Sequence, residues 1–156
     1  VMGPSLTTQT QSTSIDVMRD LGSGRQRTGV PLLEFGIVDV REVAKAHISA
    51  GFNPDAEGRH ILSAHTASLL QMATILRARF PKYPLPKKQL PKFLVKLVAP
   101  IAAGVSRDFI QKNVGYALKF DNSRSTSSLG VRYRPLTETL CEHFAQMIED
   151  GLLKRR

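Results

Sequence analysis

The chain has no tryptophan, a single cysteine and no long uninterrupted apolar run, and the last two shortages each exclude a class of protein. Cys141 cannot form an internal disulfide, which fits a reducing compartment, and we expect a cytoplasmic protein. The longest apolar candidate, residues 93–105, is interrupted by Lys96 and Pro100 and falls short of the roughly 20 residues that a membrane span needs. The sequence therefore predicts neither a disulfide scaffold nor a membrane helix.

Acidic residues are also scarce: the sequence has 13 of them and 22 lysines and arginines, which gives a formal net charge of +9. Such an excess raises the question of an anionic partner. The cations are divided among a Gly-rich turn, a Pro-rich loop and the C-terminal tail, with few aromatic residues between them and no nucleic-acid motif. Nucleic-acid binding is thus disfavoured. A basic module that holds a polyanion with residues 82–96 and the tail stays as an alternative.

The 156 residues, 42% of them hydrophobic, are enough for one core, so we expect one domain or part of one. Residues 35–47 are the most informative stretch, because a short apolar strand leads directly into a capped helix. Asp39 stands at the N-cap position and Glu42 follows three residues later as its capping-box partner. Apolar residues then recur at helical spacing.

Further elements are predicted from periodicity and from Gly and Pro punctuation. In chain order they are a helix over 15–21 ending at Gly22, strands over 32–38 and 58–63, a helix with Thr66 as N-cap, a helical stretch over 92–113 interrupted at Pro100 and Gly104, a strand over 116–120, a short helix capped by Asp121 and Asn122, and a terminal helix over 136–151. Helices outnumber strands in this α/β pattern.

Two ordered blocks carry a resemblance to a known family: residues 35–47, and residues 121–153 with their capped short helix, Gly stop and long amphipathic helix. Together they resemble the C-terminal half of an extended short-chain dehydrogenase/reductase, of the dihydroflavonol reductase and aldehyde reductase type. The opening Val-Met-Gly-Pro resembles the strand and turn that follow the family's catalytic Tyr and Lys. The resemblance implies a Rossmann-type fold with a helix-rich substrate lobe and a few short strands.

On this resemblance, the chain is the C-terminal portion of one NAD(P)-binding reductase domain. Residues 1–64 would be a remnant of the sheet with cofactor-side and substrate-side elements, and residues 65–156 mainly the substrate lobe and terminal helix. The intact enzyme would use NADP or NAD. In the family, the strand end matched by Val1 passes beside the nicotinamide, and a Ser about a dozen residues later approaches the cofactor again. The resemblance therefore implies that Val1 and Ser14 contact the cofactor. Ser12 and Thr13 are near alternatives, with Gly3 and Pro4 shaping the turn.

No catalytic residue is assigned, because the sequence lacks the family's two chemical devices. Gly22-Ser23-Gly24 with Gly29 has the wrong spacing for a dinucleotide-binding fingerprint and reads as a turn. The string from Tyr83 to Lys87 matches YxxxK, but its two intervening prolines forbid the helical turn that would bring both side chains onto one face.

Other chemical sites are disfavoured too. The four histidines, at positions 47, 60, 65 and 143, lack metal-ligand spacing, so no metal site is predicted. Cys141 follows an apolar residue on the terminal helix and is expected to be a packed or half-exposed thiol.

The leading functional hypothesis is a C-terminal fragment of an NAD(P)-dependent oxidoreductase that reduces a ketone or aldehyde, with this part forming the substrate-side wall. The partners would be a small carbonyl substrate and the missing N-terminal half. Alone, the chain is expected to be inactive. A sugar-nucleotide epimerase or dehydratase fragment is the alternative within the superfamily. A further hypothesis is an assembly subunit whose unpaired strand at Val1 docks on a separately supplied half.

Overall fold

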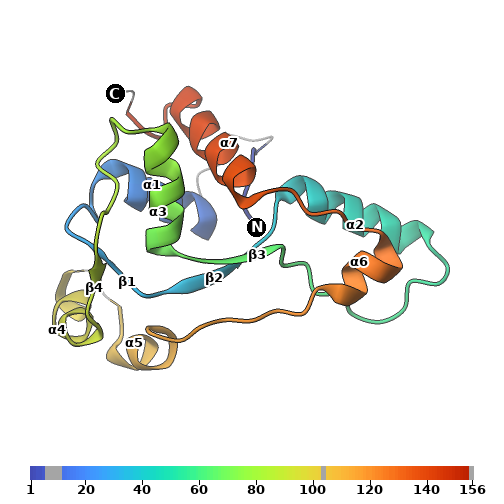
Figure 1. The fold of residues 1–156 in the computed structure, drawn as a ribbon, viewed down its shortest axis with the longest axis horizontal. Helices are drawn as coiled ribbons and strands as arrows, with labels where there is room; N and C mark the ends of the chain where they lie inside the picture. Colours follow the sequence, from blue (N-terminus) through green and yellow to red (C-terminus); the bar gives the residue numbers. More distant parts are fainter. Residues whose placement is uncertain (6–11, 103–104, 155–156) are drawn as a thin grey trace.

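The computed structural model describes residues 1–5, 12–102 and 105–154, with seven helices and four short strands among them (Figure 1). The elements are α1 (Thr13–Ser23), β1 (Val30–Pro31), β2 (Glu34–Ile37), α2 (Val40–Phe52), β3 (His65–Ser68), α3 (Leu69–Arg79), β4 (Gln89–Leu90), α4 (Lys92–Ala102), α5 (Arg107–Asn113), α6 (Ser123–Leu129) and α7 (Leu136–Glu149). No helix in this described part is long and apolar enough to cross a membrane.

The strands form two small pairs. β2 and β3 are antiparallel, with Glu34 opposite Ser68 and Ile37 opposite His65, whereas β1 and β4 run parallel. Met2 forms an isolated parallel bridge with Asp39, the N-cap of α2 two residues after β2. The fold is therefore a helix-rich α/β arrangement, as the sequence predicts.

The main core lies between α1, α3 and α7, and Phe144 of α7 is its central side chain. Phe144 is fully buried, and its ring centroid lies 4.9 Å from that of Phe80 and 5.1 Å from that of Tyr83. Figure 1 shows α3 and α7 side by side, with α2 and α6 at one end of the molecule and α4 and α5 at the other. Two smaller clusters hold those outer helix pairs together.

The helix ends follow the predicted signals in two places. Asp39 and Glu42 form the capping box of α2. Gly151, at φ 72°, ends α7, where the Leu152 N–H donates to the Met147 carbonyl over 2.9 Å and the Gly151 N–H donates to Ile148. This is the Schellman arrangement that a C-terminal glycine favours.

Three predicted boundaries are wrong. α1 runs past Gly22 to Ser23, and Gly24, at φ 93°, is the C-cap instead. Gly22 is a buried packing position, because a Cβ there would lie 2.8 Å from the Phe144 ring. The strand predicted over residues 58–63 is not formed; the strand in this region is β3, at residues 65–68. Thr66, the predicted N-cap of the next helix, therefore lies inside a strand. Ser68 is the actual N-cap of α3, with Gln71 completing its capping box.

The C-terminal half differs from expectation in three details. The helical stretch after Lys92 is divided into α4 and α5, but α4 continues through Pro100, and the expected break at Gly104 lies outside the described residues. Residues 116–120 are extended without strand pairing. Asn122 is the N-cap of α6 without a side-chain cap bond, while the Asp121 carboxylate accepts from the Ser123 N–H over 2.9 Å.

Candidate functional site

The first residues of the chain lie against the junction between β2 and α2. The Met2 N–H donates to the Val38 carbonyl over 2.9 Å, and the Val40 N–H donates to the Met2 carbonyl over 2.8 Å. Because Val40 is the first residue of α2, these bonds hold the turn that follows Met2 beside a helix N-terminus. The first N–H groups of α2 are already engaged, that of Val40 by the Met2 carbonyl and that of Arg41 by the Asp39 carboxylate.

A cleft of about 270 Å³ lies at this junction and brings together several residues that the sequence designated. Its lining comprises Val1, Met2, Gly3, Pro4, Ser5, Ser12, Ser14, Ile15, Val40 and His143. Val1 is 60% exposed, and the Ser14 hydroxyl lies 2.8 Å from the Ser12 hydroxyl at the start of α1. Val1 and Ser14 thus share one cleft, whereas Thr13 does not line it. Their contact with a cofactor stays a prediction.

Gly3 is required by the shape of the turn. Its φ of 112° is one that L side chains rarely adopt, and a Cβ at this position would lie 3.0 Å from Oδ2 of Asp39. The following residue is fastened as well, since the Ser5 N–H donates to Oε1 of Gln146 over 2.6 Å and the Gln146 amide donates to the Ser5 carbonyl over 2.5 Å. The path of the N-terminal segment is therefore fixed by contacts from α2 and α7.

His143 lines the cleft from α7, and sequence reasoning missed it. Its side chain is buried, and Nδ1 accepts a long hydrogen bond of 3.4 Å from the Gly3 N–H. Burial lowers the pKa of the imidazole below its ordinary value, the charge of the terminal amino group acts in the same direction, and Asp39 opposes both. In the neutral ring with Nδ1 as acceptor, Nε2 carries the proton. The available signal was its position on the buried face of α7, three residues after Leu140.

Asp39 is the anionic centre beneath the turn. Its buried carboxylate accepts from the Arg41 backbone N–H over 2.9 Å, from the Arg41 guanidinium over 2.8 Å at each oxygen, and from the Thr139 hydroxyl over 2.9 Å. Burial alone would raise the pKa of Asp39, but the hydrogen bonds from Arg41 and Thr139 outweigh burial and lower it to about 2. The carboxylate is therefore ionised and paired at neutral pH.

Glu42 extends this network toward the segment that precedes α7. Its buried carboxylate accepts from the backbone N–H of Arg134 over 2.7 Å and from the Arg134 Nε over 3.0 Å. Arg134 in turn pairs with Glu138, one turn into α7. The two capping residues of α2 thus connect the N-terminal segment to residues about a hundred positions later in the chain.

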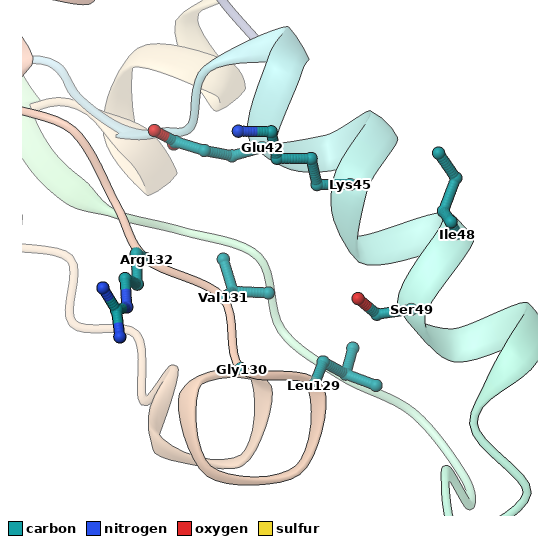
Figure 2. Close-up of a pocket in the computed structure, with 8 residues that line it drawn as sticks. All are labelled: Glu42, Lys45, Ile48, Ser49, Leu129, Gly130, Val131 and Arg132. Carbon is teal, nitrogen blue, oxygen red and sulfur yellow. The ribbon is translucent and has the colours of Figure 1, made fainter.

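A second pocket, of about 350 Å³, lies between α2 and residues 129–132 (Figure 2). Glu42, Lys45, Ile48 and Ser49 line it from the helix, and Leu129, Gly130, Val131 and Arg132 from the opposite segment. Neither Val1 nor Ser14 is among these residues. With one engaged carboxylate and two exposed cations, the pocket offers no nucleophile–base pair.

The YxxxK string is not a catalytic pair in the structure. Residues 83–87 are not helical, and Tyr83 is a buried core residue whose hydroxyl donates to the Lys154 carbonyl over 3.1 Å. Lys87 is exposed on the loop. The prediction that the prolines exclude a helix here is therefore confirmed.

The remaining candidate side chains have structural partners. His47, His60 and His65 each hydrogen-bond within 2.9 Å, to the Val43 carbonyl, the Ser128 hydroxyl and the Arg134 carbonyl respectively. No cluster of three or more potential metal ligands occurs within residues 1–5, 12–102 and 105–154. Burial raises the pKa of the Cys141 thiol, and the opposing charge of Arg79 does not offset this, so the thiolate is not favoured.

No family model matches the sequence, but individual proteins do. Tetraketide alpha-pyrone reductase 1 from Arabidopsis thaliana is 28% identical over 153 residues, which is 98% of this chain and 40% of that protein. Cinnamoyl-CoA reductase CAD2 from Medicago truncatula is 39% identical over 88 residues, 56% of this chain and 26% of that protein. The chain thus spans two-fifths or less of the length of these relatives.

Solved structures give the same picture of the fold. Gre2 from Candida albicans, crystallised with NADPH, aligns with a TM-score of 0.68 at 24% identity, over 96% of this chain and 41% of that one. Vestitone reductase from alfalfa aligns with a TM-score of 0.66 at 18% identity, over 97% of this chain and 43% of that one. In sequence and in fold, the chain is thus related to the extended short-chain dehydrogenase/reductase family and matches less than half the length of these relatives.

Proposed function

We propose that this chain supplies part of the nicotinamide-side and substrate-side wall of an NAD(P)-dependent reductase acting on a ketone or aldehyde. The observation that carries the proposal is the N-terminal cleft, which joins Val1 to Ser14 beside the first turn of α2. The relatives named above are reductases, and Gre2 was crystallised with NADPH, which favours NADP over NAD as the cofactor.

In this proposal the chain's own groups bind and orient. The Val1–Pro4 turn would lie beside the nicotinamide, and the Ser14 hydroxyl would offer a hydrogen bond from the start of α1. The cofactor would supply the hydride when bound. The proton donor is not assigned to any residue of this chain, because Tyr83 is committed to the core. We therefore expect the 156-residue chain alone to reduce nothing.

The proposed division assigns residues 1–64 to the remnant of the sheet with cofactor-side and substrate-side elements, and residues 65–156 mainly to the substrate lobe and terminal helix. β2 and β3 pair across this boundary, so the two parts share one folded unit. A sugar-nucleotide epimerase or dehydratase would use the same framework. The reductase names of the relatives favour the reductase.

Polyanion binding is the less supported alternative. Within its basic segment, Lys92 is engaged, because its Nζ donates to the Gln111 carbonyl over 3.2 Å and lies 4.5 Å from the centre of the Tyr116 ring. A salt titration of binding to random duplex DNA separates the two functions, since counterion release requires affinity that falls steeply with salt.

A chimera tests the proposal. This chain would replace the 153 aligned residues of tetraketide alpha-pyrone reductase 1, and NADPH binding would be followed by cofactor fluorescence. We expect binding, and a Kd raised roughly tenfold by Ser14→Ala through loss of one hydrogen bond. Ser127→Ala, on the exposed face of α6, is the matched control. A chimera that is folded by circular dichroism and gel filtration yet binds no NADPH would contradict the proposal.

A further inference from the structure

Exposed apolar side chains gather on α4, which lies with α5 at one end of the molecule (Figure 1). Among residues 92–98 only the Val95 side chain is buried. Four large apolar side chains are between 37% and 69% exposed, namely Phe93, Leu94, Leu97 and Val98. A helix turns by about 100° per residue, so these four positions share one continuous face roughly 140° wide. A contiguous apolar face of this kind marks an interaction site, whereas single exposed apolar residues do not.

Two cations border this apolar face. Lys96 extends from α4 itself, and Arg107 is the first residue of α5, across a groove of about 380 Å³. Phe93 and Leu97 line the same groove, together with Gln111. Neither charged side chain has an ion-pair partner among the residues that the structure describes. The groove therefore combines apolar surface with two positive charges that the chain itself leaves unmatched.

The positive charge of the chain is concentrated in the part of the sequence that holds α4 and α5. Residues 58–120 contain 11 lysines and arginines and a single acidic residue, Asp108, which gives a net charge of +10. The remaining residues contain 11 cations and 12 acidic residues, a net charge of −1. Asp108 is itself paired with Lys112 over 2.9 Å. The apolar face thus belongs to a strongly basic region.

The combination of an apolar face and unmatched cations selects among possible partners. A second copy of the chain would bring the same positive charge to the contact, and like charges that face each other oppose association. Nucleic acid would satisfy the cations, but it would leave the aliphatic side chains of the face without an apolar partner. A bilayer surface that contains anionic lipids provides negative head groups for the cations and acyl chains for the apolar side chains.

We propose that α4 and α5 dock on the surface of a bilayer that contains anionic lipids. Phe93 and Leu97, one helical turn apart, enter the acyl region, and Lys96 and Arg107 lie at the level of the head groups. With 11 residues, α4 is too short to cross a bilayer and lies in the plane of the interface. Docking needs neither a cofactor nor turnover, so it stands or falls separately from the proposed function.

Flotation with lipid vesicles tests the docking on the 156-residue chain itself. The probes are vesicles of phosphatidylcholine alone and vesicles that also contain about one-third phosphatidylserine. We expect the anionic vesicles to bind the chain about tenfold more tightly, and this preference to decrease as salt is added. Lys96→Gln and Arg107→Gln should each weaken binding roughly fivefold, the contribution of one cation near an anionic surface. Lys45→Gln, at an exposed lysine of α2, is the matched control.

A second pair of variants tests the apolar contribution. Leu97→Ser leaves every charge in place, and we expect it to weaken binding roughly tenfold through loss of the inserted side chain. Ile48→Ser, at a similarly exposed aliphatic residue of α2, should bind as the unmodified chain does. Circular dichroism checks that each variant is folded, and Phe93→Ser replaces Leu97→Ser if the latter is not.

Four outcomes would overturn the proposal. The first is no binding to anionic vesicles at low salt, and the second is equal losses in the α4–α5 variants and their α2 controls. The third is full binding by Leu97→Ser, because charge alone would then suffice and a polyanion would be the better partner. The fourth is a dimer in gel filtration that Leu97→Ser dissociates, which would assign the face to a second copy. The chimera described above, if it binds NADPH, should bind the vesicles too; failure to do so would mean that the other half covers this face and would equally refute the docking.

Discussion

The strongest prediction concerns the buried carboxylate of Asp39, because it caps α2 and also lies under the turn at Gly3. In Asp39→Asn the amide oxygen can still accept the Arg41 backbone N–H, but the amide nitrogen then takes the place of Oδ2 and faces both the Arg41 Nη2 and the Thr139 hydroxyl. The variant therefore loses charge pairing and gains a mismatched donor. Arg41 keeps a second partner in Glu142, 2.6 Å away, which limits the damage.

The size of this effect on stability follows from the difference between the pKa values of Asp39 in the folded and unfolded chain. The ordinary pKa of an aspartate, 3.8, is lowered to about 2 in the fold. Each tenfold change in the protonation equilibrium corresponds to about 1.4 kcal/mol, so ionised Asp39 contributes about 2 kcal/mol to the free energy of unfolding. Since the folded pKa is the lower one, this contribution is complete above pH 3.8 and is lost as the pH falls toward 2.

Chemical denaturation at several pH values measures this. At pH 7 we expect Asp39→Asn to lower the free energy of unfolding by about 2 kcal/mol, and the difference from the unmodified chain should shrink between pH 4 and pH 2. Asp121→Asn, at an exposed carboxylate, is the control and should leave the unfolding midpoint nearly unchanged. Equal stability of Asp39→Asn and the unmodified chain at pH 7 would refute the account of this network.

A second variant separates the contribution of the Thr139 hydroxyl to stability from that of the Asp39 charge. Thr139→Val removes the buried donor to Oδ2 of Asp39 while keeping the branched shape, and we expect a loss of about 1.5 kcal/mol at pH 7 together with a higher Asp39 pKa. Thr137→Val, exposed two residues earlier on the same helix, should have little effect on the unfolding midpoint.

Three further outcomes can be checked by the same denaturation measurements. Gly3→Ala should cost about 2 kcal/mol, because φ is 112° and the new methyl group would meet the Asp39 carboxylate; a neutral effect would mean that the turn adapts. Phe144→Ala should cost about 4 kcal/mol by emptying the centre of the core, while Phe120→Ala, at an exposed ring, should be mild. The lowered pKa of His143 predicts that stability falls as the pH drops below the ordinary value of 6.5, and that His143→Gln loses this part of the pH dependence.

Sequence patterns predicted the elements whose signals are local. The Asp39–Glu42 box and the Gly151 stop depend on residues within one or two helical turns, so their chemistry can be read from a short window. β3 was misplaced because its strand character comes from pairing with β2, about 30 residues away, and its sequence His-Thr-Ala-Ser has no apolar alternation. A window that contains only one partner of such a pair lacks that information.

For the same reason the sequence named only some of the residues that line the N-terminal cleft. Val1 and Ser14 came from a resemblance that covered the order of the blocks. His143, which lines the cleft, and Gln146, which bonds to the lining residue Ser5, come from a helix about 140 residues away. Neither side chain belongs to a short motif. Their role depends on the packing of α7 against α3, which fixes where these two side chains lie.

The groups that stabilise this fold and those that shape its cleft are largely the same. Asp39 caps the first turn of α2, and its carboxylate lies where a side chain at position 3 would collide with it. From α7, the Thr139 hydroxyl donates to that carboxylate, and His143 accepts from the Gly3 N–H. A change in any of these contacts therefore moves the Val1–Pro4 turn as well as the unfolding equilibrium. For this reason, variants near the cleft can be interpreted functionally only when their stability is measured alongside, and Ser14, which lies outside the Asp39 network, is the cleaner probe of ligand binding.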